Sequence, residues 1–317
     1  MRLKFLLRAL HDQLVCYWKR RLWPSSRCRF RSTHGLPDGS GEIVNPRNRG
    51  IELHFPIIIA GHSHIEALGK VPLHLGDAPP TLAPLLLQEF ASLTGAWPRA
   101  DTYWDDLCSV APGRLVGISW GGAEYVGLFF FAQLPYFDVL LPDYEDEKID
   151  ESRLIVPYRM AREVFQSSMP TLDALVVKLK SIEGCVPFLI GAPPPRGDHD
   201  HVQAMFEQKH EWFEQLANAL NTHQKSLGVR PAFLSISNMK LNPPRLRYKL
   251  WLVSQMLQQE IAKAQGIPFV SSPPETLDAD GYLRPEFAKD FTHANQAYGG
   301  IMLRHIKSQL GKQHASV

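Results

Sequence analysis

From residue 52 onward, short apolar runs alternate with longer stretches of helical periodicity, and this alternation most constrains the fold. The runs are rich in β-branched residues and end at Gly, Pro or polar residues, which is typical of buried strands. Strands that alternate with helices form βαβ units, in which helices cover both faces of a mostly parallel sheet. Five strands are predicted, at 52–61, 114–120, 185–193, 232–237 and 267–272.

The segments between these runs carry the helical pattern. Helices are predicted from 64 to about 70, over 80–94, over 158–183 with a break at Pro170, and over 200–226, 245–265 and 294–310. Parallel sheets covered in this way bind ligands beyond the carboxyl ends of their strands. The polar residues that directly follow each strand are therefore the candidates for a functional site.

The chain divides into a basic N-terminal extension, 1–50, and one predicted domain, 51–317. Residues 1–50 contain 11 Lys or Arg and three Asp or Glu, against 34 and 32 in the whole chain, so the domain is mildly acidic. That balance argues against a nucleic-acid partner. The extension is predicted to be flexible, with a weak membrane-surface contact through a helical apolar stripe in 1–23 as the alternative.

The cysteines and the hydropathy indicate a reducing, aqueous compartment. The four cysteines are scattered without a Cys-x-x-Cys pair, which argues against a zinc ribbon or a disulfide framework. The apolar start of the chain is interrupted by Arg8, His11 and Asp12, and no run approaches the 18 apolar residues of a membrane-spanning helix. We therefore expect a cytoplasmic protein.

A serine follows the first predicted strand, in the segment Gly61-His62-Ser63-His64. A serine on a tight strand-to-helix turn lies close to backbone amides that stabilise negative charge, which suits a nucleophile. Taken alone, the segment is more typical of a serine that caps a helix.

A second segment supplies the partners that such a nucleophile needs. Asp290 precedes His293 by three residues. A serine nucleophile requires a base, and the base requires a carboxylate that holds its tautomer, so one turn can supply both groups. The alternative is a helix start that is capped by Thr292 or Asn295, with His293 merely exposed.

Together the two segments resemble the SGNH hydrolases, also called GDSL-like esterases and lipases, over roughly residues 52–310. The resemblance implies a three-layer α/β/α, flavodoxin-like fold and no cofactor or metal. It implies a serine hydrolase that cleaves a carboxylic ester, with O-acyl groups on a carbohydrate as one substrate class. Ser63 would attack the ester, His293 would act as general base and then general acid, and Asp290 would orient His293.

Two positions depart from the family pattern. His62 replaces the usual aspartate before the serine, and we expect this change to be tolerated. Ala123 stands where the family has an asparagine that donates to the oxyanion, and loss of one such donor costs roughly 10²–10³ in turnover. The backbone amides of Ser63 and Gly122 would then form the oxyanion hole. The alternative is a weak or inactive binding protein on the same scaffold.

Other polar residues near the predicted strand ends are expected to contact the substrate. They are His62, His64, Glu124 and Arg196.

Two metal-like patterns are weaker. The Gly-His-x-His segment at 61–64 also fits calcineurin-like metallophosphoesterases, but it stands first in the domain rather than last, and the other metal-binding motifs are missing. The run Asp198-His199-Asp200-His201 contains possible metal ligands, although a polar loop at a helix start is the favoured interpretation.

Overall fold

The structure is a computed structural model that describes part of the chain. Its described residues are 57–61, 63–69, 103–109, 111–121, 130–132, 135–142, 149–166, 169–208, 211 and 240–314. The extension 1–50 and the predicted helix 80–94 lie outside them.

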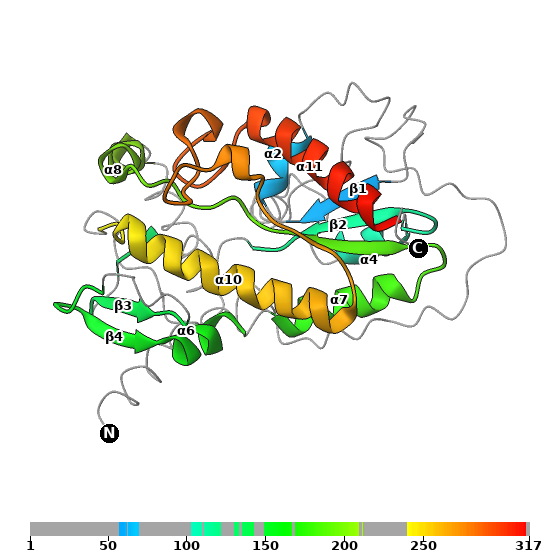
Figure 1. Ribbon diagram of the computed structural model, residues 1–317, viewed down its shortest axis with the longest axis horizontal. Coiled ribbons are helices and arrows are strands. Elements are labelled where there is room, and N and C mark those ends of the chain that lie inside the picture. The colour runs from blue at the N-terminus through cyan, green and yellow to red at the C-terminus, as the bar shows by residue number, and fades with distance from the viewer. Residues whose placement is uncertain are drawn as a thin grey trace.

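Four strands form a parallel sheet in the order β1-β2-β5-β6 (Figure 1). They are β1 (Ile57–Gly61), β2 (Leu115–Ser119), β5 (Val186–Ile190) and β6 (Phe269–Val270). Each lies within a predicted strand, so the α/β class and the parallel sheet are confirmed. The described sheet nevertheless has four strands rather than five, because the segment predicted as the remaining strand, 232–237, is outside the described residues.

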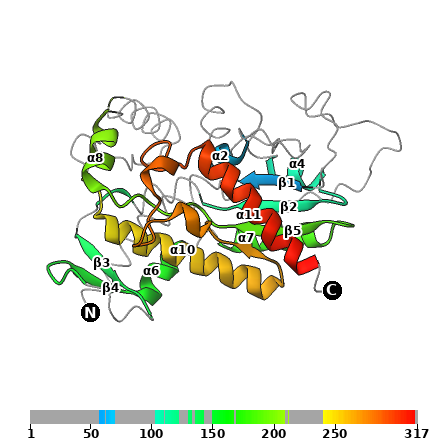
Figure 2. The same cartoon turned by 45° about the horizontal axis from the view of Figure 1, so that its top comes forward.

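Helices cover both faces of this sheet (Figure 2). On one face are α2 (Glu66–Gly69) and α11 (Gln296–His314), and on the other are α4 (Tyr103–Ser109), α7 (Met169–Lys180) and α10 (Pro244–Gln265). Successive strand residues point to opposite faces. Ile59 accordingly packs in the core beside α11, whereas Ile58 and Ala60 pack in the core beside α7 and α10. The described elements thus form the predicted three layers.

The predicted helix over 158–183 is two helices, α6 (Tyr158–Phe165) and α7. Because α6 ends at Phe165 and α7 begins at Met169, the helix is interrupted before Pro170 rather than at it. Pro170 is the second residue of α7, where a missing N–H costs no intrahelical hydrogen bond. The helix predicted at 245–265 is confirmed as α10, which ends at Gly266 in a left-handed conformation. The helix predicted from 200 begins as α8 (His199–Gln208).

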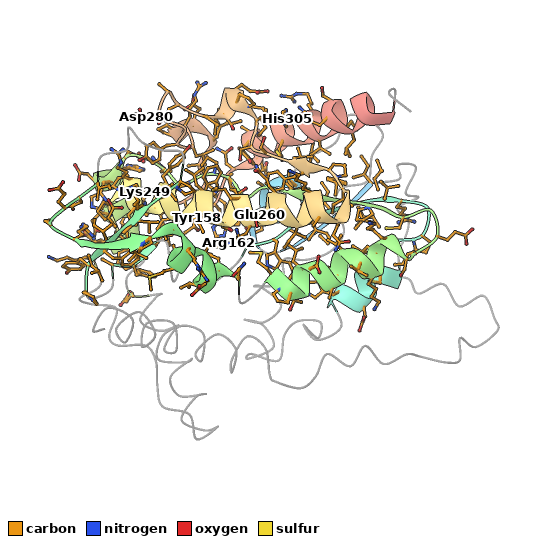
Figure 3. All side chains as sticks on the ribbon, turned by 60° about the horizontal axis from the view of Figure 1, so that its bottom comes forward. Tyr158, Arg162, Lys249, Glu260, Asp280 and His305 are labelled. Carbon is orange, nitrogen blue, oxygen red and sulfur yellow. The ribbon has the colours of Figure 1, made fainter. Side chains whose placement is uncertain are left out.

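A second, two-stranded parallel sheet was not predicted. It consists of β3 (Phe137–Leu140) and β4 (Leu154–Pro157) and lies beside α6 and α10 (Figure 1). A buried ion pair fastens β3 to α10, since Lys249 Nζ lies 3.0 and 3.1 Å from the carboxylate oxygens of Asp138. On the surface, Arg162 of α6 donates to Glu260 of α10 at 2.9 Å (Figure 3). This small sheet therefore extends the domain on the side of α10.

Within the described ranges, no helix is both long and apolar enough to span a membrane. Cys108 and Cys185 are free thiols that pack against the main core. Burial, together with the nearby Cys108, raises the pKa of Cys185 to about 11, so this thiol behaves as the small hydrophobic residue that the sequence predicts.

Candidate active site

The predicted serine turn lies at the carboxyl end of β1. Ser63 is the first residue of the short 3₁₀ helix η1 (Ser63–Ile65), which leads directly into α2. Gly61 allows this path, because a Cβ atom there would lie 2.2 Å from the carbonyl oxygen of Ser119 on the neighbouring strand. The backbone at Ser63 therefore begins a helix at the sheet edge where ligands bind in such folds.

Asp290 and His293 form a closed turn that is held by hydrogen bonds. The backbone amides of Thr292 and His293 each donate to Asp290 Oδ1 at 2.8 Å. His293 Nδ1 lies 3.0 Å from both carboxylate oxygens of Asp290. In the neutral ring Nδ1 therefore carries the proton and donates a hydrogen bond to Asp290, and Nε2 is unprotonated.

Thr292 contacts both members of this pair, although it was not predicted to belong to the site. Its hydroxyl donates to Asp290 Oδ1 at 3.1 Å and lies 2.8 Å from His293 Nδ1. Thr292 thus contacts both Asp290 and His293 through its hydroxyl instead of capping a helix. The helix cap belongs to Asn295, whose side-chain oxygen accepts from the backbone amide of Tyr298 at 3.1 Å.

The electrostatics keep Asp290 ionised. Asp290 is 9% exposed, and burial alone would raise its pKa. Hydrogen bonding and charge attraction from His293, with the backbone amides of Thr292 and His293, outweigh burial, so the pKa of the Asp290 carboxyl lies well below its ordinary value. A charged carboxylate therefore stands beside the imidazole at neutral pH, ready to stabilise an imidazolium.

Two contacts bring the start and the end of the domain together. The rings of His64 and His293 are 5.4 Å apart between centroids, at an interplanar angle of 48°. Glu66 Oε2 lies 2.7 Å from Lys289 Nζ, although the two residues are 223 positions apart. The segment that begins at Ser63 and the turn of Asp290 and His293 therefore lie side by side, at the same rim of the sheet, with α2 packed on α11 (Figure 2).

Arg196 lies in the loop that follows β5. It is buried, and its Nε donates to Asp198 Oδ1 at 2.8 Å while Nη2 donates to the other oxygen. Its charge is thus balanced within its own loop. The neighbouring residues His199, Asp200 and His201 begin α8. No cluster of three or more His, Cys, Asp or Glu side chains with metal-binding geometry occurs in the described part of the chain.

The structure thus describes five of the predicted site residues and leaves three outside. It gives the backbone position of Ser63 and brings His64, Asp290 and His293 together, while Arg196 lies in the loop after β5. The predicted site residues outside the described ranges are His62, Gly122 and Glu124, and Ala123, which replaces the family's asparagine, also lies outside them.

Comparison with known proteins finds no matching family model and no matching curated protein. Similar solved structures include a GDSL-like lipase from Bacteroides thetaiotaomicron, 14% identical with a TM-score of 0.35, covering 81% of this chain and 88% of that one. A carbohydrate acetylesterase from Sinorhizobium meliloti is 13% identical with a TM-score of 0.36, covering 81% and 98%. The periplasmic domain of a Salmonella ser. Paratyphi A lipopolysaccharide acetyltransferase is 11% identical with a TM-score of 0.39, covering 82% and 85%. At TM-scores below 0.4, the chemistry of this site has to be judged from its own side chains.

Proposed function

We propose that this chain is a serine hydrolase of the SGNH type that cleaves a carboxylic ester. Ser63 is the nucleophile, His293 is the general base and then the general acid, and Asp290 orients His293. The observation that carries the proposal is the contact between the rings of His64 and His293, which joins the hydrogen-bonded acid–base pair to the helix that begins at Ser63.

In the first half of the reaction, Ser63 Oγ attacks the ester carbonyl carbon and its proton passes to His293 Nε2. The tetrahedral oxyanion that forms is held by the backbone amides of Ser63 and Gly122. The imidazolium then protonates the leaving alkoxide, and the acyl group remains on Ser63. In the second half, His293 takes a proton from water, hydroxide attacks the acyl-enzyme, and Ser63 recovers its proton as the carboxylic acid leaves.

Asp290 serves two purposes in this sequence. By accepting a hydrogen bond from Nδ1–H it keeps Nε2 unprotonated before the attack, and by staying ionised it stabilises the imidazolium that the attack creates.

The substrate class within this proposal is an O-acyl group on a carbohydrate. The charge of Arg196 is already balanced by Asp198, so this side chain is better suited to an uncharged, hydroxyl-rich substrate than to an anionic one. Aromatic rings gather beyond the end of β5, where Tyr282 lies against the backbone of Gly197 and contacts Tyr248 at 5.1 Å between ring centroids. Both rings are partly exposed, and partly exposed aromatic rings of this kind suit the apolar faces of sugar rings. His62 and Glu124 are the remaining proposed substrate contacts, whereas the buried ring of His64 packs on His293.

A fluorophosphonate probe tests the proposal without knowledge of the substrate, because it reacts covalently with an activated serine. We expect labelling of the wild-type chain and none of Ser63→Ala. Ser181→Ala is the matched control, since Ser181 is exposed and its hydroxyl donates to the carbonyl of Lys178. Equal labelling of wild type and Ser63→Ala would remove Ser63 from the mechanism.

Hydrolysis of short p-nitrophenyl esters and of acetylated sugars then separates the enzyme from the binding-protein alternative. Restoring the family's amide donor in Ala123→Asn is expected to raise turnover at least about tenfold. Absence of activity in both the wild type and Ala123→Asn would favour a binding role.

A further inference from the structure

The segment that carries Ser63 and the loop that carries Asp290 and His293 are joined by a ring contact and by an ion pair. We propose that His64, Glu66 and Lys289 are positioning residues that fix the imidazole of His293 relative to the nucleophile's helix. This inference rests on the proposed function and assigns to these residues a role in geometry rather than in proton transfer. We call these three residues, together with His293, the clamp.

The ring contact supports one side of the imidazole. Asp290 holds the Nδ1 edge of His293, but hydrogen bonds to a single edge leave the ring able to tilt about them. His64 is only 7% exposed, and its ring packs against that of His293 at 5.4 Å. The ring of His64 limits the tilt on its side, because a buried ring is close-packed and cannot easily give way.

The ion pair holds the backbone of the same loop. The side chain of Glu66 is 18% exposed and that of Lys289 is 47% exposed, and the pair is 2.7 Å long. The backbone amide of Lys289 donates to the carbonyl oxygen of His293 at 2.8 Å. Glu66 on α2 is therefore linked through Lys289 to the backbone of His293, and through the chain to Asp290.

Such links matter because the reaction is sensitive to small displacements. A misplacement of the base by about 1 Å can cost roughly 10² in rate. A partly exposed ion pair is weaker than a buried one, so its loss should loosen the loop rather than unfold it. The clamp should thus act on kcat, with KM for a small ester unchanged.

The first experiment measures labelling by the fluorophosphonate probe and hydrolysis of p-nitrophenyl acetate. Glu66→Gln and Lys289→Met are each expected to lower both rates about threefold to tenfold, and the double variant should be no worse than either single one. The charge-reversed pair, Glu66→Lys with Lys289→Glu, should recover most of the rate that Glu66→Lys alone loses. His64→Ala should lose about tenfold, and His64→Phe, which keeps a ring, should retain most of the rate.

Glu260→Gln is the matched control. It removes the ion pair between Glu260 and Arg162 (Figure 3), whose side chains are partly exposed, as are those of Glu66 and Lys289. That pair joins α6 to α10, on the other side of the sheet from α2 and α11. Glu260→Gln should leave the labelling rate unchanged.

The second experiment does not depend on catalysis. Hydrogen exchange of a peptide spanning 286–296 reports on the amides of the Asp290 turn. We expect faster exchange there in Glu66→Gln and Lys289→Met, with unchanged exchange in α10.

The outcomes are distinguishable. If the probe does not label the wild type, the proposed function fails. Unchanged hydrogen exchange at 286–296 in the variants would overturn the clamp, whatever the labelling shows. If wild type is labelled but the variants react at its rate, the positioning role is wrong even where exchange is faster. Additive losses in the Glu66 and Lys289 double variant would also overturn it, because they would show that the two residues act separately.

Discussion

Replacement of Asp290 by Asn isolates the charge of this carboxylate from its shape. The asparagine oxygen can still accept from the backbone amides of Thr292 and His293, which now donate to Asp290 Oδ1 at 2.8 Å. The turn should therefore persist. The amide NH₂ would face His293 Nδ1, however, where an acceptor now lies at 3.0 Å. Nδ1 would then become the acceptor and Nε2 would carry the proton.

An imidazole in that tautomer cannot accept the proton of Ser63. The corresponding change in a well-studied serine protease lowers kcat roughly 10⁴-fold, which is about 5 kcal/mol of transition-state stabilisation. We expect a loss of the same order in fluorophosphonate labelling and in ester hydrolysis. Asp290→Ala is the companion variant, because it also leaves two backbone amides without their acceptor and should unfold more easily by about 1–3 kcal/mol. Labelling of Asp290→Asn at the wild-type rate would refute the assigned role.

The same substitution should reveal itself in the pH dependence of stability. The pKa of Asp290 is lower in the folded protein than its ordinary value of about 3.9. A lowered folded-state pKa means that the carboxylate stabilises the fold above the ordinary value and that this contribution disappears as the pH falls below it. The difference in urea stability between wild type and Asp290→Asn should thus shrink as the pH falls below about 4. A difference that grows over that acidic range would contradict the environment described for Asp290.

Two further substitutions and one modification reaction test the packing of the fold. Lys249→Met leaves the buried carboxylate of Asp138 without its cation, so urea unfolding should show a loss of about 3–5 kcal/mol; a loss below about 1 kcal/mol would contradict the buried pair. Gly61→Ala places a Cβ atom 2.2 Å from the carbonyl oxygen of Ser119, and calorimetry should show a destabilisation of about 1–3 kcal/mol or more, whereas an unchanged Tm would argue against this close approach. Iodoacetamide at pH 8 should modify Cys185 roughly 100-fold more slowly than a cysteine with the ordinary pKa, because the pKa of about 11 leaves little thiolate; peptide mass spectrometry measures the rate, and fast modification would contradict the burial.

Much of the main sheet follows from local pattern. The run at Ile57–Gly61 is apolar, β-branched and ended by glycine, and a buried parallel strand is the structure that suits it. The sequence of α10 shows helical periodicity over a long stretch and is followed by a glycine. The sheet of β3 and β4 carries no comparable signal, because each strand has only four residues and partly exposed positions. Parallel pairing of such short strands is decided by what packs on them, here α6 and α10.

The functional site divides in the same way. Asp290 and His293 lie within one turn, so their spacing along the chain is enough to predict that they interact, and the sequence by itself determined that pair. Nothing local predicts that Glu66 pairs with Lys289 or that His64 packs on His293. Those contacts exist because α2 and α11 cover the same face of the sheet and bury a shared apolar core. Hydrophobic burial is non-directional, so which distant polar groups meet at its rim was decided only by the tertiary structure.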